Sequence, residues 1–264
     1  MPESRDVRLG SFVAVGDSFT EGLDDPYPDP GRGYRGWADL VAGQLAAEDP
    51  GFRYANLAVR GRMIGEIVAD QVPLAERLRP DLVSIAGGGN DVIRPRCDPV
   101  RVIGLLDEAV GRLAATGATV VLFTGADVTV RMPGTARLRP RIVAVNRAIR
   151  AIARTHGALL VDLAAEPGLE DPRFFSDDRL HFAATGHRRI AAMTLEALGR
   201  EVSPQWREPL PFAPPLPWVR ARTEDLRWAG RHLAPWVRRR LAGRSSGDGR
   251  ASKRPELGPV DRTP

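Results

Sequence analysis

The sequence predicts a three-layer α/β/α fold, and two observations support this prediction. Short apolar runs rich in β-branched residues recur along residues 12–163, and segments with apolar residues at helical spacing separate them. Strands that alternate with helices in this way form a parallel sheet covered by helices on both faces. We therefore expect a flavodoxin-like parallel sheet of about five strands, followed by a proline-rich and helical C-terminal extension.

The individual elements follow from these two periodicities. Strands are predicted at residues 12–15, 54–58, 82–86, 119–123 and 158–163. Apolar residues recur three or four positions apart, as on one face of a helix, in residues 37–45, 102–113, 142–152 and 190–198. Ligands of such sheets bind outside the carboxyl ends of the strands. Polar residues that directly follow a strand are therefore candidates for a functional site.

The composition changes after Ser203. The segment SPQWREPLPFAPPLPW is too rich in proline for a helix interior or a central strand. Helical spacing returns in TEDLRWAGRHLAPWVRRRL, which Pro235 is expected to kink or divide. We predict a first domain over residues 1–203, a strap and basic helical segment packed on it over 204–242, and a disordered tail over 243–264.

A membrane surface is the disfavoured alternative partner for the basic helical segment. A basic helix with tryptophans can lie on anionic lipid. We favour packing on the first domain because the proline-rich segment resembles a strap and Pro235 interrupts the apolar face of the helix.

Composition narrows the class of protein. The 264 residues contain one cysteine, Cys97, which excludes an intrachain disulfide framework. The chain has no run of 18 apolar residues, and its first residues lack the long apolar segment of a secretory signal, so we expect a cytoplasmic protein. Of the charged residues after Arg200, 13 are basic and 7 acidic, so the net charge of +5 arises in the tail. Since no nucleic-acid-binding motif accompanies this charge, no nucleic-acid partner is expected.

The stretch GDSFTEG places Ser18 directly after the first predicted strand. A serine there either caps a helix or acts as a nucleophile. A nucleophile needs a general base, a group that orients the base, and donors for the oxyanion. His181 has the most suggestive setting of the four histidines, because Asp178 precedes it by three residues and can turn back to its Nδ1. Taken alone, this pair is better explained as surface capping of the following helix.

Two glycine-containing turns complete the set of candidate residues. GGGND places Asn90 after one predicted strand, and NLAVRG places Gly61 after another. The side-chain amide of Asn90 and the backbone amide of Gly61 can donate hydrogen bonds to one oxygen. Each stretch alone is also explained as a turn, and Gly65 is the less favoured alternative to Gly61.

In combination, these blocks resemble the SGNH hydrolases, also called GDSL esterases or lipases. The blocks are Ser18 in GDSF, Gly61 in NLAVRG, Asn90 in GGND, and Asp178 with His181 in DRLH; they cover about residues 10–200. The resemblance implies that residues 1–203 form a catalytic domain with Ser18 as nucleophile, His181 as base and Asp178 as its orienting acid. It also implies an oxyanion hole made by the Ser18 and Gly61 amides and the Asn90 side chain.

Two residues depart from the family pattern. Phe19 stands where leucine is usual, and Phe182 follows the histidine where proline is common. Both are apolar, so we expect them to alter packing or pocket shape rather than remove activity. The resemblance does not extend to the C-terminal tail.

The remaining polar residues near these blocks are expected to be structural. They are Asp17, Asp91, Asp162, His156 and His187. No cluster of His, Cys, Asp and Glu has convincing metal-ligand spacing, so we expect neither metal nor cofactor. Four arginines flank the glycine-containing turns, at positions 60, 62, 94 and 96. An anionic substrate would explain them, but solvated surface positions explain them better in a chain so rich in arginine.

We therefore expect a serine hydrolase that cleaves small-molecule carboxylic esters through an acyl-enzyme. One alternative is an acyltransferase on the same scaffold, which an acceptor assay would distinguish. Another is a non-catalytic binding protein whose basic tail engages an acidic partner or a membrane. The complete set of site residues argues against this last alternative.

Overall fold

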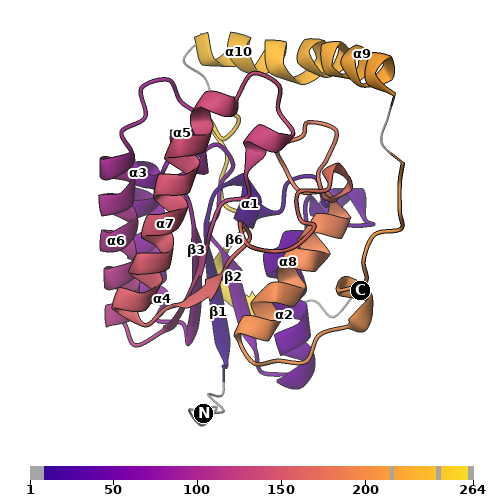
Figure 1. The fold of residues 1–264 in the computed structure, drawn as a ribbon. Helices are drawn as coiled ribbons and strands as arrows, with labels where there is room; N and C mark the ends of the chain where they lie inside the picture. Colours follow the sequence, from indigo (N-terminus) through magenta and orange to yellow (C-terminus); the bar gives the residue numbers. More distant parts are fainter. Residues whose placement is uncertain (1–8, 215–216, 242–244, 261–264) are drawn as a thin grey trace.

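The computed structural model describes residues 9–214, 217–241 and 245–260, and within them one mixed sheet forms the centre (Figure 1). The strands are β1 (Ser11–Gly16), β2 (Arg53–Asn56), β3 (Leu82–Ala86), β4 (Thr119–Phe123), β5 (Leu159–Val161) and β6 (Arg254–Pro259). Their order is β5-β4-β3-β1-β2-β6, with every pair parallel except β2 and β6. The predicted α/β class is confirmed, and the sheet has one strand more than expected.

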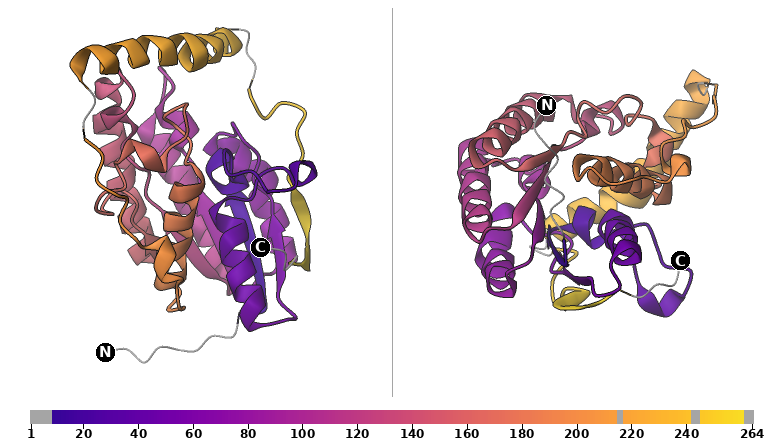
Figure 2. Two further views of the ribbon diagram at one scale, coloured as in Figure 1. Left: turned by 90° about the vertical axis from the view of Figure 1, so that its right-hand side faces the viewer. Right: turned by 90° about the horizontal axis from the view of Figure 1, so that it is seen from below.

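Helices cover both faces of the sheet (Figures 1 and 2). The helices up to the C-terminal extension are α1 (Ser18–Glu21), α2 (Gly36–Glu48), α3 (Ile64–Glu66), α4 (Val72–Leu78), α5 (Gly89–Val92), α6 (Pro99–Ala115), α7 (Arg139–His156) and α8 (Ala184–Ala197). One face packs against α2 and α8, and the other against α3, α4, α6 and α7. Strand β1 shows why: Phe12 and Ala14 belong to the first core, and Val13 and Val15 to the second. Successive side chains of a strand point to opposite faces, so both faces of a buried strand must be apolar.

The strand order places the ends of β1 and β3 side by side. Gly16 pairs with Ala86 at their carboxyl ends. The chain leaves β1 for β2 and returns to β3 on the other side of β1, so the connections diverge at this point. Open α/β sheets have their ligand-binding crevice at such a divergence. Ser18 and Asn90 follow these two strands directly.

The prediction of a disordered tail over residues 243–264 is wrong for the part that the structure describes. Strand β6 pairs antiparallel with β2, aligning Tyr54 with Gly258, and forms one edge of the sheet (Figure 2). Its prolines are compatible with an edge strand, whose outer side needs no partner. The sequence of β6 does not alternate in hydrophobicity, so only the long-range pairing identifies it as a strand. Residues 243, 244 and 261–264 of the predicted tail lie outside the described residues.

Lys253 anchors this returning segment. Its Nζ donates to the Asp39 carboxylate at 2.8 Å and to the carbonyl oxygens of Tyr34 and Arg35 at 3.0 and 2.7 Å. Asp39 also accepts hydrogen bonds from the hydroxyls of Tyr27 and Tyr54, each at 2.8 Å. The lysine therefore satisfies a buried carboxylate that links α2 to the C-terminal segment.

We expect Lys253→Met to lower the free energy of unfolding by about 3 kcal/mol, because it leaves the Asp39 charge buried without its cation. Urea unfolding at neutral pH measures the change. Arg250→Met, at an exposed position three residues away, is the matched control and should unfold like the unmodified protein. Equal unfolding midpoints for the two variants would contradict the anchoring role.

The extension after residue 203 follows the surface and then crosses the carboxyl edge of the sheet. Its first part, residues 204–211, packs on the domain: Trp206 contacts the core, and Arg189 donates to the carbonyl oxygens of Arg207 and Glu208. The second part is a continuous helical segment composed of α9 (Trp218–Trp228), a π-helical turn (Ala229–Leu233) and α10 (Ala234–Leu241), which we call the roof segment (Figure 1). The π-helical turn ends two residues before Pro235, which has no N–H for the regular hydrogen-bond ladder.

The aromatic residues of the extension differ in burial. Trp228 is buried, whereas Phe212 and Trp218 are 90% and 74% exposed. The predicted packing of residues 204–242 on the first domain therefore does not bury Phe212 and Trp218. Among the described residues, no helix is both long enough and apolar enough to cross a membrane.

Candidate active site

Ser18 is the first residue of α1, where the chain turns sharply out of β1. The turn needs a glycine before it, because a Cβ on Gly16 would lie 2.7 Å from the carbonyl oxygen of Ala86. Asp17 caps the helix by accepting a hydrogen bond from the Phe19 amide at 3.0 Å. Asp17 therefore has the structural role that was predicted for it, and the side chain of Ser18 is not the helix cap.

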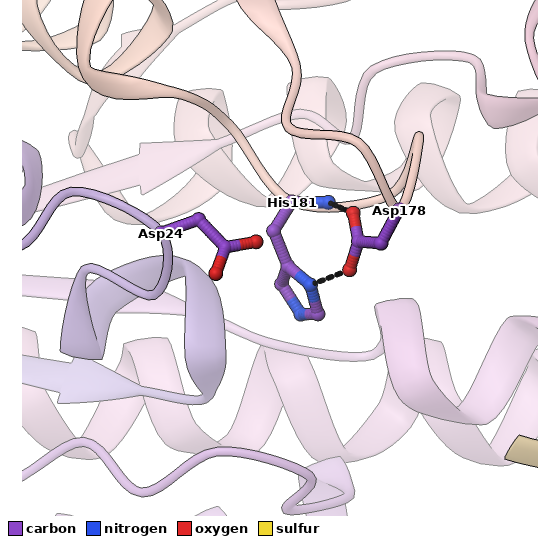
Figure 3. Close-up of side chains that lie close together, drawn as sticks. All are labelled: Asp24, Asp178 and His181. Atoms are coloured by element: carbon purple, nitrogen blue, oxygen red, sulfur yellow. Dashed lines mark hydrogen bonds and ion pairs between the residues drawn. The ribbon is translucent and has the colours of Figure 1, made fainter. Parts of the chain in front are cut away.

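The structure brings Ser18, His181 and Asp178 into one hydrogen-bonded chain. His181 Nε2 lies 2.9 Å from Ser18 Oγ, and its Nδ1 lies 2.5 Å from Asp178 Oδ2. The other oxygen of Asp178 accepts from the backbone amide of His181 at 2.9 Å (Figure 3). It also accepts from the Leu180 amide and the Ser176 hydroxyl. These bonds fix the carboxylate, and the carboxylate in turn fixes the imidazole with Nε2 toward the serine.

The electrostatics of the pair favour a charged acid and a basic histidine. Burial alone would raise the pKa of Asp178, but the hydrogen bond and charge of His181, with two backbone amides, hold it well below the ordinary value. Burial would likewise lower the pKa of His181, but the hydrogen bond and charge of Asp178 outweigh it and raise that pKa above 6.5. An imidazole of raised basicity beside a hydroxyl can take its proton.

Asn90 and Gly61 complete the predicted set. Asn90 Nδ2 lies 3.0 Å from Asp17 Oδ2 and 3.0 Å from the Arg62 carbonyl oxygen, so both its N–H groups have acceptors. Gly61 has a φ of 76°, a conformation that a side chain would strain, and its carbonyl oxygen accepts from the Ser245 hydroxyl at 3.3 Å. Gly65, the disfavoured alternative, lies in α3 instead.

All five predicted residues line one cavity of about 440 Å³, which we call the outer cavity. The roof segment closes its far side with Trp228, Leu233 and Trp236. Trp228 Nε1 donates to the carbonyl oxygen of Asp178 at 2.9 Å, and Asp225 forms a 2.6 Å ion pair with Arg179. The roof segment is therefore docked directly on the loop that carries Asp178 and His181.

A second cavity of about 190 Å³, the inner cavity, extends from Ser18 and His181 into the domain. Its wall is mostly apolar and includes Phe19, Phe123, Ile142, Val145, Phe175 and Phe182. The two departures from the family pattern thus shape this wall: the rings of Phe19 and Phe182 meet edge to face at 5.9 Å. Phe182 also bridges to Phe175 and closes the loop of residues 175–182.

Asp24 was not among the predicted site residues, and it lies beside His181 on the side away from Asp178 (Figure 3). It follows α1 in the left-handed region, at a φ of 69°. Potential ligand atoms of Asp24, Asp178 and His181 lie within 4.8 Å of one another, a proximity that spacing in the sequence did not predict. Asp178 and His181 are hydrogen-bonded to each other, and this bond accounts for the proximity of their ligand atoms. The negative charge of Asp24 adds to the raised pKa of His181.

His187 is structural, as its position predicted. It is fully buried in α8, where Nδ1 accepts from the Trp37 amide at 3.2 Å and Nε2 contacts the Leu23 carbonyl oxygen at 3.1 Å. Burial lowers the pKa of His187 to about 4. The neutral Nε2–H tautomer fits both partners, and protonation would remove the acceptor for Trp37.

We expect His187 to make folding sensitive to acid. The unfolded chain takes up a proton at this histidine near pH 6.5 and the folded protein only near 4, so its contribution of about 3 kcal/mol is lost as the pH falls through this window. Burial raises the pKa of Asp17 to about 6, which acts in the opposite direction. The test therefore compares two proteins. The difference in the free energy of unfolding between the unmodified protein and His187→Gln should be smaller at pH 4.5 than at pH 7. A constant gap would exclude this linkage.

The flanking arginines are not a free anion site as a group. Arg60 forms an ion pair with Glu21, and Arg62 forms one with Glu66 at 2.6 Å. The predicted interpretation as ordinary surface residues fits Arg96, which is exposed.

The comparisons with known proteins agree with this architecture. The GDSL-like lipase/acylhydrolase family matches residues 14–189. A GDSL lipase of Mycobacterium tuberculosis is 27% identical over 201 residues, 72% of this chain and 82% of the relative. The crystal structure of TesA is 26% identical with a TM-score of 0.57, covering 71% of this chain and 97% of that one.

Two further solved structures share the fold. An α/β hydrolase from the metagenome of Lake Arreo is 26% identical with a TM-score of 0.60, covering 72% of this chain and 95% of that one. The acetylxylan esterase Axe2 of Geobacillus stearothermophilus is 22% identical with a TM-score of 0.61, covering 74% and 96%. Since the family match spans more than half of the residues, this chain belongs to the GDSL-like lipase/acylhydrolase family and is a carboxylic ester hydrolase of the SGNH type.

Proposed function

We propose that the protein cleaves carboxylic esters through an acyl-enzyme, with Ser18 as nucleophile. The observation that carries the proposal is the chain of hydrogen bonds from Ser18 Oγ through His181 to Asp178, which opens on two cavities. In the first step Ser18 Oγ attacks the ester carbonyl and His181 Nε2 takes its proton. His181 then returns the proton to the departing alkoxide. Water, activated by the same nitrogen, attacks the acyl-serine and releases the acid.

The oxyanion of each tetrahedral intermediate would be held by the backbone amides of Ser18 and Gly61 and by Asn90 Nδ2. Asn90 is already fixed between Asp17 and the Arg62 carbonyl, so its donor is positioned before the substrate arrives. One of its two N–H groups exchanges its present acceptor for the oxyanion. The exchange leaves the amide group in place, so its dipole is oriented before charge develops on the ester oxygen.

We expect Asn90→Ala to lower kcat by about 10²–10³-fold with little change in KM, because the amide matters chiefly when charge develops on the oxygen. Steady-state kinetics on one ester measures both constants, and circular dichroism verifies the fold of the variant. A raised KM at constant kcat would instead assign Asn90 to ground-state binding.

The test of the proposed function is a panel of esters of graded acyl length with purified protein, run beside a fluorophosphonate label. Hydrolysis together with labelling at Ser18 supports the proposal, and turnover without a labelled serine contradicts it. The outer cavity of about 440 Å³ leaves room for an acceptor alcohol, which favours acyl transfer as the second candidate. The same assay with added alcohols distinguishes the two, since a transferase forms a new ester at the expense of free acid.

A further inference from the structure

One buried cation lies in the otherwise mostly apolar wall of the inner cavity. Arg131 follows the short 3₁₀ turn Val128–Val130 and is 8% exposed. It lines the same cavity as Ser18 and His181. A guanidinium in such surroundings is normally paired with a carboxylate.

No carboxylate among the described residues forms an ion pair with Arg131. Its Nη1 donates to the Asp127 carbonyl oxygen at 3.2 Å, and its Nε donates to the Arg179 carbonyl oxygen at 3.4 Å. The Asp127 carboxylate is engaged elsewhere, 3.3 Å from Arg139 Nε. Arg131 Nη2 is buried and has no hydrogen-bond partner among the described residues.

Three other partly buried arginines of the described chain differ from Arg131 in their partners. All three are more exposed than Arg131, and each forms an ion pair with a carboxylate. The pairs are Arg60 with Glu21, Arg150 with Asp162, and Arg189 with Glu166. Burial lowers the pKa of Arg131 to about 10, so the group is still charged at neutral pH.

The guanidinium is held in place by an aromatic ring. It stacks on Phe175, with its central carbon 3.3 Å from the ring centroid. A stacked guanidinium directs its N–H groups outward in its own plane, so the ring leaves the donors of Nη2 unused. Arg131 lines the inner cavity, so its guanidinium places a full positive charge beside an occupant of that cavity.

We propose that the inner cavity binds acyl groups that end in a carboxylate, with Arg131 as the ion-pair partner of that carboxylate. The substrates would then be half-esters of dicarboxylic acids: the ester carbonyl lies at Ser18, the methylene chain contacts the apolar wall, and the free carboxylate pairs with the guanidinium of Arg131. The inference rests on the proposed function, because it assigns the acyl group to the inner cavity beside the nucleophile. Arg131 is not among the arginines at 60, 62, 94 and 96, for which an anionic substrate was the less favoured explanation.

A purely structural role predicts a different result and must be separated from this one. Arg131 contacts Phe175 and Arg179 on either side of Asp178, so its loss could displace the triad and impair every substrate alike. Anion binding, in contrast, impairs only the charged substrate. The decisive quantity is therefore the ratio of kcat/KM for two esters that differ in charge and little else.

The matched pair is monobenzyl glutarate and benzyl 5-methylhexanoate, in which two methyl groups replace the carboxylate oxygens. We expect the unmodified protein to prefer the glutarate half-ester. We expect Arg131→Met to lower its kcat/KM by about 10²-fold, as for a lost charged hydrogen bond, and to change the neutral ester by less than about threefold. Arg131→Lys should recover part of the preference, and Arg139→Met, at an exposed position nearby, should leave it unchanged.

A binding measurement keeps the inference independent of turnover. Ser18→Ala protein should bind monobenzyl glutarate more tightly than benzyl 5-methylhexanoate by calorimetry, and adding Arg131→Met should remove the difference. If neither ester is hydrolysed by the unmodified protein, the proposed function fails, while this charge-dependent binding still supports the anion site. Equal binding of the two esters, or an equal loss of both in Arg131→Met, would overturn it.

Discussion

Ser18→Ala is expected to abolish labelling by a fluorophosphonate and to lower ester turnover by about 10⁴–10⁶-fold, since removal of a triad nucleophile has effects of this size. The reason is geometric: Ser18 Oγ is the hydroxyl that lies 2.9 Å from His181 Nε2 at the junction of the two cavities. Mass spectrometry of the labelled peptide and kinetics on one ester measure the two effects.

A control from the same cavity sharpens the test. Ser246 also lines the outer cavity, but among the described residues it forms no hydrogen bond to a histidine. Ser246→Ala should therefore keep both labelling and turnover. Full activity in Ser18→Ala, or loss of labelling only in Ser246→Ala, would refute Ser18 as the nucleophile.

The second large effect is expected for Asp178→Asn, which should lower kcat by about 10⁴-fold. An amide in place of the carboxylate can still accept from the His181 and Leu180 backbone amides, so the loop should keep its shape. Its NH₂ group, however, would face Nδ1 and force the proton of the imidazole onto Nε2. That tautomer cannot take the proton of Ser18.

The pH profile gives a second readout of the same pair. Only the neutral imidazole is a base, so kcat/KM should rise with pH, with a midpoint above 6.5 because Asp178 raises the pKa of His181. In Asp178→Asn the remaining activity should have a lower midpoint, since the negative charge is gone. Asp177→Asn, at the exposed neighbouring position, is the matched control and should keep both rate and midpoint. An unchanged profile in Asp178→Asn would show that another acid, with Asp24 the nearest candidate, supports His181.

The sequence was sufficient for the five parallel strands of the sheet and for the residues around Ser18. Strands β3 and β4 have the predicted bounds, and β1 and β2 lie within two residues of theirs, because a strand buried on both faces is a local run of apolar residues. The candidate site followed from the same patterns. Parallel strands carry their carboxyl ends to one edge, so short polar blocks after successive strands must meet there, however far apart they are in the chain.

The tertiary structure alone decided the features that depend on partners distant in sequence. Strand β6 has no periodicity of its own and exists because the edge of β2 is open to it, with Lys253 fixed on Asp39. The roof segment was predicted as a helix, but its docking over Ser18 follows from the contacts of Trp228 and Asp225 with the loop of His181.

The same distinction applies to the charged residues of the site. A sequence shows that an arginine or an aspartate is present, but not which opposite charge folding brings to it. The sequence alone does not show that Arg60 and Arg131 have different partners. In the folded structure, Arg60 forms an ion pair with Glu21, whereas Arg131 contacts only carbonyl oxygens and an aromatic ring. Local sequence patterns thus determined the scaffold and the position of Ser18 at the end of β1. The pairing of buried charges was decided by the folded structure, because an ion pair joins positions that only folding brings together.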